Sequence, residues 1–98
     1  MLIKIHKSCR EVISICDKEL LGKYFEQENL QLDIKESFYK GEEFSEKKAI
    51  ELIKDFTKED ATFNIVGKKS VQTSLKAGII EKKGIKEIAG IPYALVLM

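Results

Sequence analysis

Three side chains near the start of the chain, His6, Cys9 and Cys16, have the chemistry to bind a transition metal or to act in nucleophilic catalysis. In the hairpin that we predict for residues 1–16, Cys16 lies opposite Leu2, four residues along the strand from His6. That separation is roughly 13 Å at about 3.3 Å per residue, too far for one zinc ion to bind both. Arg10 beside Cys9 favours the thiolate, but a Cys-His pair would depend on His6 alone. We therefore expect no metal site and interpret both cysteines as structural thiols.

A second candidate is the segment Val66-Gly67-Lys68-Lys69-Ser70, which follows a predicted strand and opens a predicted helix. Backbone N–H groups at the start of a helix can hold an anion. The segment is not a Walker loop, because the first glycine of that motif would fall at Thr62 and Lys69 replaces the magnesium-binding Ser or Thr. Two interpretations of Gly67 stay open: a tight turn, or a contact to a phosphate or RNA backbone beside Lys68.

The stretch from Ser37 to Glu43 is the hardest to explain as structure alone, because it places two aromatic residues, a glycine and two carboxylates in one connection. Adjacent Glu42 and Glu43 have the chemistry for an acid and base pair or for a divalent ion. Carboxylates ahead of a helix also suit the helix dipole, so a structural role is the alternative. We expect Phe38 to cover an edge of the core and Tyr39 to be displayed.

Length and charge limit the class of protein. Ninety-eight residues suffice for one domain with one core. Seventeen basic and sixteen acidic side chains give a net charge of +1, which favours neither nucleic acid nor a membrane surface. The apolar runs are far shorter than a membrane span of about 20 residues, and the start of the chain lacks the pattern of a signal peptide. We expect one cytoplasmic domain, residues 1–98, without a membrane segment.

The first third of the chain reads as short antiparallel strands. Alternating isoleucines predict a hairpin over residues 1–16 whose pairing sets Ile5 opposite Ile13. Asp17 can then cap one helical turn that ends at Gly22. Two further strands are expected at residues 24–25 and 30–34, which would make this end of the sheet mostly antiparallel.

The second half of the chain alternates helices and strands. Ser45 is a helix start, and apolar spacing predicts helices at about residues 46–56 and 68–77, the latter stopped by Gly78. Strands are expected at 63–66, 85–89 and 93–97. The last one lacks polar alternation, which is typical of a strand covered on both faces. The fold class is therefore α/β (α+β), a mixed sheet with an N-terminal antiparallel hairpin, two main helices, a crossover and a buried C-terminal strand.

Groups of short motifs follow one another along nearly the whole chain. They are Cys16-Asp17-Lys18-Glu19-Leu20-Leu21-Gly22-Lys23, then Leu32-Asp33-Ile34 with Ser37-Phe38-Tyr39 and Gly41-Glu42-Glu43, then Asn64-Ile65-Val66-Gly67, and finally Gly90-Ile91-Pro92-Tyr93-Ala94. In this order they resemble an archaeal family catalogued as domain of unknown function 424. The resemblance implies a small archaeal cytosolic protein without an established activity, encoded near translation genes, and it supplies no catalytic residues.

The chain departs from this family at one position. The relatives carry histidine after the proline, whereas here Tyr93 follows Pro92. A tyrosine hydroxyl donates or accepts a hydrogen bond but is a poor general base near neutral pH. The resemblance therefore does not support general-base catalysis at Tyr93.

Two hypotheses about function follow. The first is a non-catalytic binding module for a protein or RNA partner, with translation as the setting that the resemblance suggests. The second is a small enzyme or small-ligand-binding domain, which requires Tyr39, Glu42, Glu43, Asn64 and Lys68 to converge in space. The chain has no complete catalytic set and no cofactor motif, so we favour the first. The candidate binding residues are Tyr39, Lys40, Gly41, Glu42, Glu43, Asn64, Gly67 and Lys68.

Overall fold

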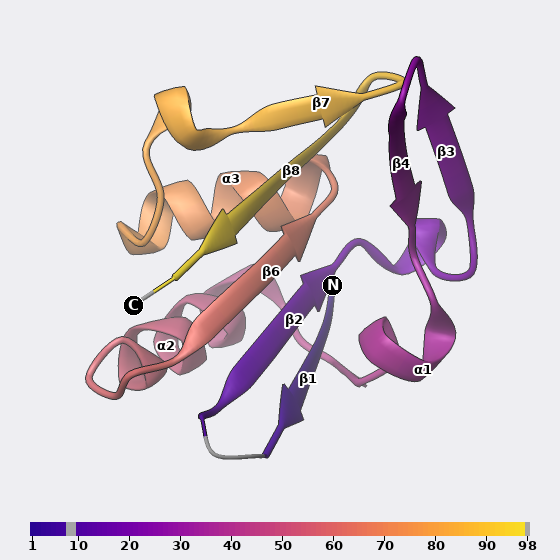
Figure 1. The fold of residues 1–98 in the computed structure, drawn as a ribbon. Helices are drawn as coiled ribbons and strands as arrows, with labels where there is room; N and C mark the ends of the chain where they lie inside the picture. Colours follow the sequence, from indigo (N-terminus) through magenta and orange to yellow (C-terminus); the bar gives the residue numbers. More distant parts are fainter. Residues whose placement is uncertain (8–9, 98) are drawn as a thin grey trace.

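A six-stranded mixed sheet forms the centre of the structure, a computed structural model that describes residues 1–7 and 10–97. The strand order is β5-β1-β2-β6-β8-β7, and Figure 1 labels all of these strands except β5. Strands β2 and β6 are parallel, and the other neighbouring strands are antiparallel. The bounds are β1 (Leu2–His6), β2 (Val12–Cys16), β5 (Glu42–Glu43), β6 (Thr62–Val66), β7 (Lys86–Ile88) and β8 (Ile91–Val96).

Two helices, α2 (Glu46–Phe56) and α3 (Lys68–Ala77), lie on one side of this sheet, behind β6 and β8 in Figure 1. Part of the other side is covered by the single-turn helix α1 and by a separate two-stranded hairpin. The remaining bounds are α1 (Glu36–Tyr39), β3 (Tyr24–Gln27), β4 (Leu30–Asp33) and the 3₁₀ turns Lys18–Leu20 and Lys82–Gly84. Among the described residues, no helix has the length and apolar character needed to cross a membrane.

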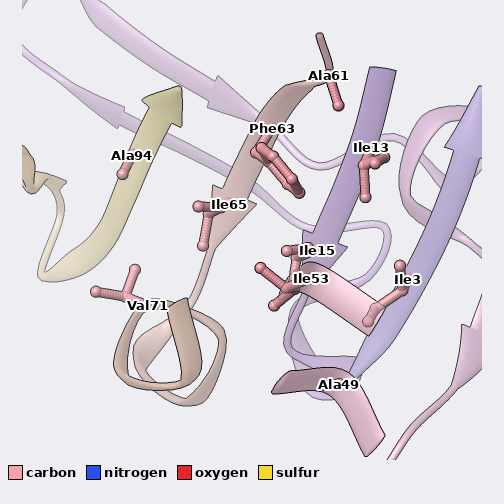
Figure 2. Close-up of a cluster of buried hydrophobic side chains, with 10 residues drawn as sticks. All are labelled: Ile3, Ile13, Ile15, Ala49, Ile53, Ala61, Phe63, Ile65, Val71 and Ala94. Atoms are coloured by element: carbon pink, nitrogen blue, oxygen red, sulfur yellow. The ribbon is translucent and has the colours of Figure 1, made fainter. Parts of the chain in front are cut away.

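The predicted N-terminal hairpin is confirmed with its register, because Ile3 pairs with Ile15 and Ile5 with Ile13. Odd-numbered residues of β1 and β2 therefore face the helices, and even-numbered residues face the other way. Figure 2 shows Ile3 and Ile15 meeting Ile53 of α2 in the main core. The apolar residues of β1 and β2 on the helix side join this core, which fixes the register.

Both main helices begin and end where the sequence predicts. The Ser45 hydroxyl accepts a hydrogen bond from the Lys48 N–H at 3.3 Å, and Ala49 and Ile53 bury one face of α2. Helix α3 ends at Gly78, whose φ of 81° is the left-handed conformation that glycine adopts readily. Helix α3 connects β6 to β7, which run parallel to one another with β8 between them. The crossover predicted for this half of the chain is therefore present, with one strand inserted.

Two features of the strands differ from the sequence-based expectation. Strands β3 and β4 pair only with each other and form a second small sheet, whose tip contacts the β7-β8 turn (Figure 1). Strand β8 lies inside the main sheet, but only one of its faces is well covered: Ala94 is 5% exposed and Leu95 is 57% exposed. The reason is that the β3-β4 hairpin packs near Tyr93, at one end of the strand, and stops short of Leu95.

Candidate functional site

The structure does not bring together the residues of the predicted small enzyme or ligand-binding site. Glu42 lies on β5 and Asn64 on β6, and these strands are three inter-strand spacings apart, about 14 Å. Glu43 is exposed, and its carboxylate lies 3.3 Å from the Lys18 ammonium. Lys68 lines a different cavity from Glu42. The convergence that a small catalytic site at these residues requires is therefore not present.

The predicted anion site at the start of α3 is filled by a carboxylate of the chain itself. The Lys69 N–H donates to Asp17 Oδ2 at 3.1 Å, and the Ser70 N–H donates to Asp17 Oδ1 at 2.8 Å. The Ser70 hydroxyl adds a third bond to Oδ1 at 2.7 Å. The parallel pairing of β2 with β6 places Asp17, which follows β2, beside Gly67, which follows β6. Gly67 is therefore the turn that lets Asp17 cap α3.

The predicted local role of Asp17 is wrong in consequence. Asp17 precedes the turn Lys18–Leu20, but its side chain makes no capping hydrogen bond there. Helix α3 is long enough to offer several unpaired N–H groups and a positive dipole end, whereas a single turn offers little. The carboxylate is stabilised by the longer helix.

Tyr39 is buried, and the expectation that it is displayed is wrong. It belongs to a second apolar cluster with Cys16 and Ile34, and the half-buried Phe38 packs against that cluster as predicted. Burial raises the pKa of the Cys16 thiol to about 12 and that of the Tyr39 phenol to about 12. Both groups are therefore neutral at physiological pH, and neither is an activated nucleophile or base.

We expect the free energy of unfolding to fall as pH rises from about 9 toward 12. In the unfolded chain the Cys16 thiol and the Tyr39 phenol ionise near 9.0 and 10.0, whereas both ionise near 12 in the folded protein. The unfolded state thus loses these protons first. The stabilisation that the two neutral groups give to the folded state is therefore fully present below about pH 9 and is lost progressively as the pH rises toward 12. Urea unfolding at a series of pH values measures this slope. Tyr39→Phe should flatten it, and an unchanged slope would contradict the burial of the phenol.

His6 and the cysteines occupy separate places. His6 Nε2 lies 2.8 Å from the Phe38 carbonyl oxygen, and its ring stacks on the Phe38 ring with 4.4 Å between centroids. Cys16 lies opposite Leu2, as predicted, and its thiol donates to the Asp17 carbonyl at 3.1 Å. Cys9 lies outside the described residues.

A concave feature lies at the outer edge of β1, and we call it the β1 groove. It has a volume of about 460 Å³. Its lining combines four apolar residues with two lysines, a glycine and a glutamate: Ile3, Ile5, Phe44, Leu52, Lys4, Lys40, Gly41 and Glu42. Three of the predicted residues, Lys40, Gly41 and Glu42, thus meet here.

The edge of β1 beside this groove is only half paired. Phe44 N–H donates to the Met1 carbonyl at 2.8 Å, and Ile3 pairs with Glu42. In an antiparallel ladder the next residue with backbone groups on this side is Ile5, and its partner would be Lys40. The Lys40 N–H instead donates to the Glu36 carbonyl in α1 at 2.9 Å. The ladder therefore stops after Ile3, and the Ile5 edge is left beside the groove.

Gly41 marks the point where the chain leaves β1. A Cβ on Gly41 would lie 2.1 Å from the Ile3 carbonyl oxygen and 2.8 Å from the Lys4 nitrogen, both backbone atoms. Only glycine permits this approach, because every other residue would push β5 away from β1. The glycine predicted as part of a functional loop therefore shapes one end of the groove.

Comparison with known proteins agrees with this architecture. The model of the family described as Protein of unknown function (DUF424) matches residues 6–98. The chain belongs to the DUF424 family. A solved structure described as "Crystal structure of an uncharacterized conserved protein from Methanopyrus kandleri" is similar to this DUF424 chain, with a TM-score of 0.86 and 25% sequence identity over 98% of this chain and 90% of that one. No curated protein matches the chain.

The groove of this DUF424 chain contains apolar residues that the sequence did not indicate as part of a site. Ile5, Phe44 and Leu52 fit apolar patterns of a strand or helix, but Ile5 is 38% exposed. Alternation in a strand shows which face is apolar and does not show whether the strand is an edge. The available signal was the glycine at position 41, which indicates a close backbone approach.

Proposed function

We propose that this protein is a non-catalytic binding module that accepts an extended segment of a protein partner as an added strand along β1. The observation that carries the proposal is the early stop of the β1-β5 ladder, which leaves the Ile5 backbone beside an apolar groove. Strand addition uses backbone hydrogen bonds for affinity and a side-chain pocket for specificity. The groove volume of about 460 Å³ lies within the range of ligand pockets.

A protein partner fits this surface better than RNA. Binding of single-stranded RNA depends on aromatic rings that are free to stack on bases. Here Phe38 already stacks on His6, and Tyr39 is buried in the second cluster. The start of α3, the other expected contact to a phosphate, holds the Asp17 carboxylate. Translation factors and ribosomal proteins are the first partners to test, because of the setting that the sequence resemblance suggests.

The test begins with selection of a phage-displayed library of random peptides on the folded protein. Enriched peptides are synthesised and titrated against isotope-labelled protein while amide signals are followed by NMR. We expect the Ile5 amide to shift and its hydrogen exchange to slow, because a new strand would engage that N–H. Peptides that shift only residues of α3, β7 or β8 would argue against the proposal.

Ile5→Pro should lower the affinity for these peptides by about tenfold or more. The substitution removes one backbone hydrogen bond, and the proline ring keeps the partner strand from approaching β1 closely. The fold should survive, because the Ile5 N–H points away from β2 and proline is tolerated at such edge positions. Ile5→Val keeps the N–H and is the matched control, expected to bind nearly as well as the wild type. Equal affinity for all three proteins, each with an unchanged circular dichroism spectrum, would refute strand addition.

RNA binding is a separate outcome of the same measurements. We expect fluorescence anisotropy to detect no binding of single-stranded oligonucleotides at the groove, that is, no binding to the wild type that is lost in Ile5→Pro. An oligonucleotide that competes with the selected peptides and shifts the same amides would assign the groove to nucleic acid and overturn the protein-binding proposal.

A further inference from the structure

The open half of the β1 edge has a different charge from the half that β5 covers. Lys4 and Lys40 carry ammonium groups beside Ile5, and Lys40 lines the groove. The Lys4 ammonium donates to the Ser37 carbonyl at 2.8 Å, a neutral partner that leaves its charge unbalanced. The carboxylate of the groove, on Glu42, lies opposite Ile3 at the covered end.

The other charged residues near this edge do not line the groove. On α2, Lys48 and Asp55 flank Leu52 by one helical turn on either side. Beyond Ile5, Lys7 interacts with Glu11, which shares a hydrogen bond with a second carboxylate, Glu59; burial and this hydrogen bond raise the pKa of Glu11. Within the groove lining, Lys4 and Lys40 carry two positive charges against the single carboxylate of Glu42.

The geometry of a β-strand predicts on which face each side chain of the partner segment lies. A residue opposite Ile5 has its side chain on the face of Ile5, above the apolar groove. Its two neighbours have their side chains on the opposite face, where Lys4 and His6 lie. Opposite charges on directly opposed or diagonal positions of neighbouring strands are favourable.

We infer that the segment added to β1 is acidic, with an apolar residue opposite Ile5 and carboxylates on either side of it. This inference rests on the proposed strand addition and names the chemical class of its partner. A second copy of this chain would bring two basic edges together and is disfavoured by the same charges.

The test uses three acetylated peptides of the pattern X-Thr-X-Val-X-Thr-X, in which X is Glu, Gln or Lys. Their affinities for the folded protein are measured by NMR titration of the Ile5 amide. We expect the Glu peptide to bind about tenfold more tightly than the Gln peptide, and the Lys peptide to bind most weakly. The advantage of the Glu peptide should shrink when NaCl is raised from about 0.05 to 0.5 M.

Charge reversal locates the effect on the surface. Lys4→Glu reverses the charge on the face where the carboxylates lie, and should lower affinity for the Glu peptide and raise it for the Lys peptide, each by about threefold. Lys82→Glu makes the same charge change in the exposed turn ahead of β7, at the other edge of the sheet, and should leave both affinities unchanged. A change of equal size in both variants would show a general effect of net charge and overturn the inference.

The outcomes separate this inference from the proposal beneath it. Equal affinity of the three peptides, all lost in Ile5→Pro, would overturn the acidic preference and leave strand addition standing. The same result follows if none of the three binds while library-selected peptides do. Preference for the Glu peptide that persists in Ile5→Pro would show a basic surface without an added strand and would overturn both. Failure of all peptides, selected and designed, would also overturn both.

Discussion

Gly67→Ala should destabilise the protein by about 3 kcal/mol or more, enough to unfold a large fraction of a marginally stable domain. An added Cβ would lie 2.3 Å from Asp17 Cγ and 2.6 Å from Asp17 Oδ2, inside the atoms that cap α3. The backbone φ of 107° at this position also strains any residue with a side chain. Urea unfolding followed by circular dichroism measures the loss.

Gly84→Ala is the matched control for this substitution. A Cβ at Gly84 meets no atom within 4 Å, and its φ lies outside the strained region. We expect a change within about 0.5 kcal/mol. If Gly67→Ala proved as mild as Gly84→Ala, the close approach between Asp17 and the start of α3 would be wrong.

Asp17→Ala should cost about 3 kcal/mol, the second of the two largest effects. It removes the acceptor of three hydrogen bonds and leaves the Lys69 and Ser70 N–H groups without that partner at a buried helix end. A single exposed cap contributes only about 1 kcal/mol. Ser45→Ala, which removes the one capping bond of α2, is the control that shows this smaller value.

Asp17→Asn separates the hydrogen bonds from the charge. The amide oxygen still accepts from Ser70, while the amide nitrogen cannot accept from Lys69. An intermediate loss between those of Asp17→Ala and the wild type is expected. If the wild type, Asp17→Asn and Asp17→Ala all had the same midpoint of thermal unfolding, the Asp17 carboxylate would not be the cap of α3.

The two large effects are coupled because they act at one point. The three atoms nearest to a Cβ at position 67 all belong to the Asp17 side chain. In the Asp17→Ala background the cost of Gly67→Ala should therefore be smaller than in the wild type, and a double-mutant cycle measures the difference. Strict additivity would place Asp17 away from Gly67.

Most of the regular structure was predictable because its causes are local. Ser45 with the apolar spacing that follows it defines α2, and alternating isoleucines define the β1-β2 register. Gly78 ends α3 because glycine tolerates the left-handed conformation. In each case the deciding residues lie within one element or one turn, so their order along the chain carries the information.

The candidate site was predicted only in part. The loop at residues 37–43 was the right place to look, since Lys40, Gly41 and Glu42 line the β1 groove. Tyr39 was expected at the surface, because an aromatic residue beside a glycine and charged residues looks the same in sequence whether α1 turns it inward or outward. The apolar lining from Ile5 and Leu52 was missed because the two residues come from a strand and a helix far apart in the chain.

The sequence by itself determined the two main helices and most of the strands, the apolar faces of these elements, and membership of a family recognisable from its succession of motifs, but not α1 or β5. The tertiary structure alone decided where Asp17 acts, since its partners at α3 are 52 and 53 residues away. It also decided that β1 keeps an open edge, because the Lys40 N–H is used by α1. The physical reason is the same in both cases: a polar group binds the best donor or acceptor that folding brings near it, and that neighbour need not be close in the chain.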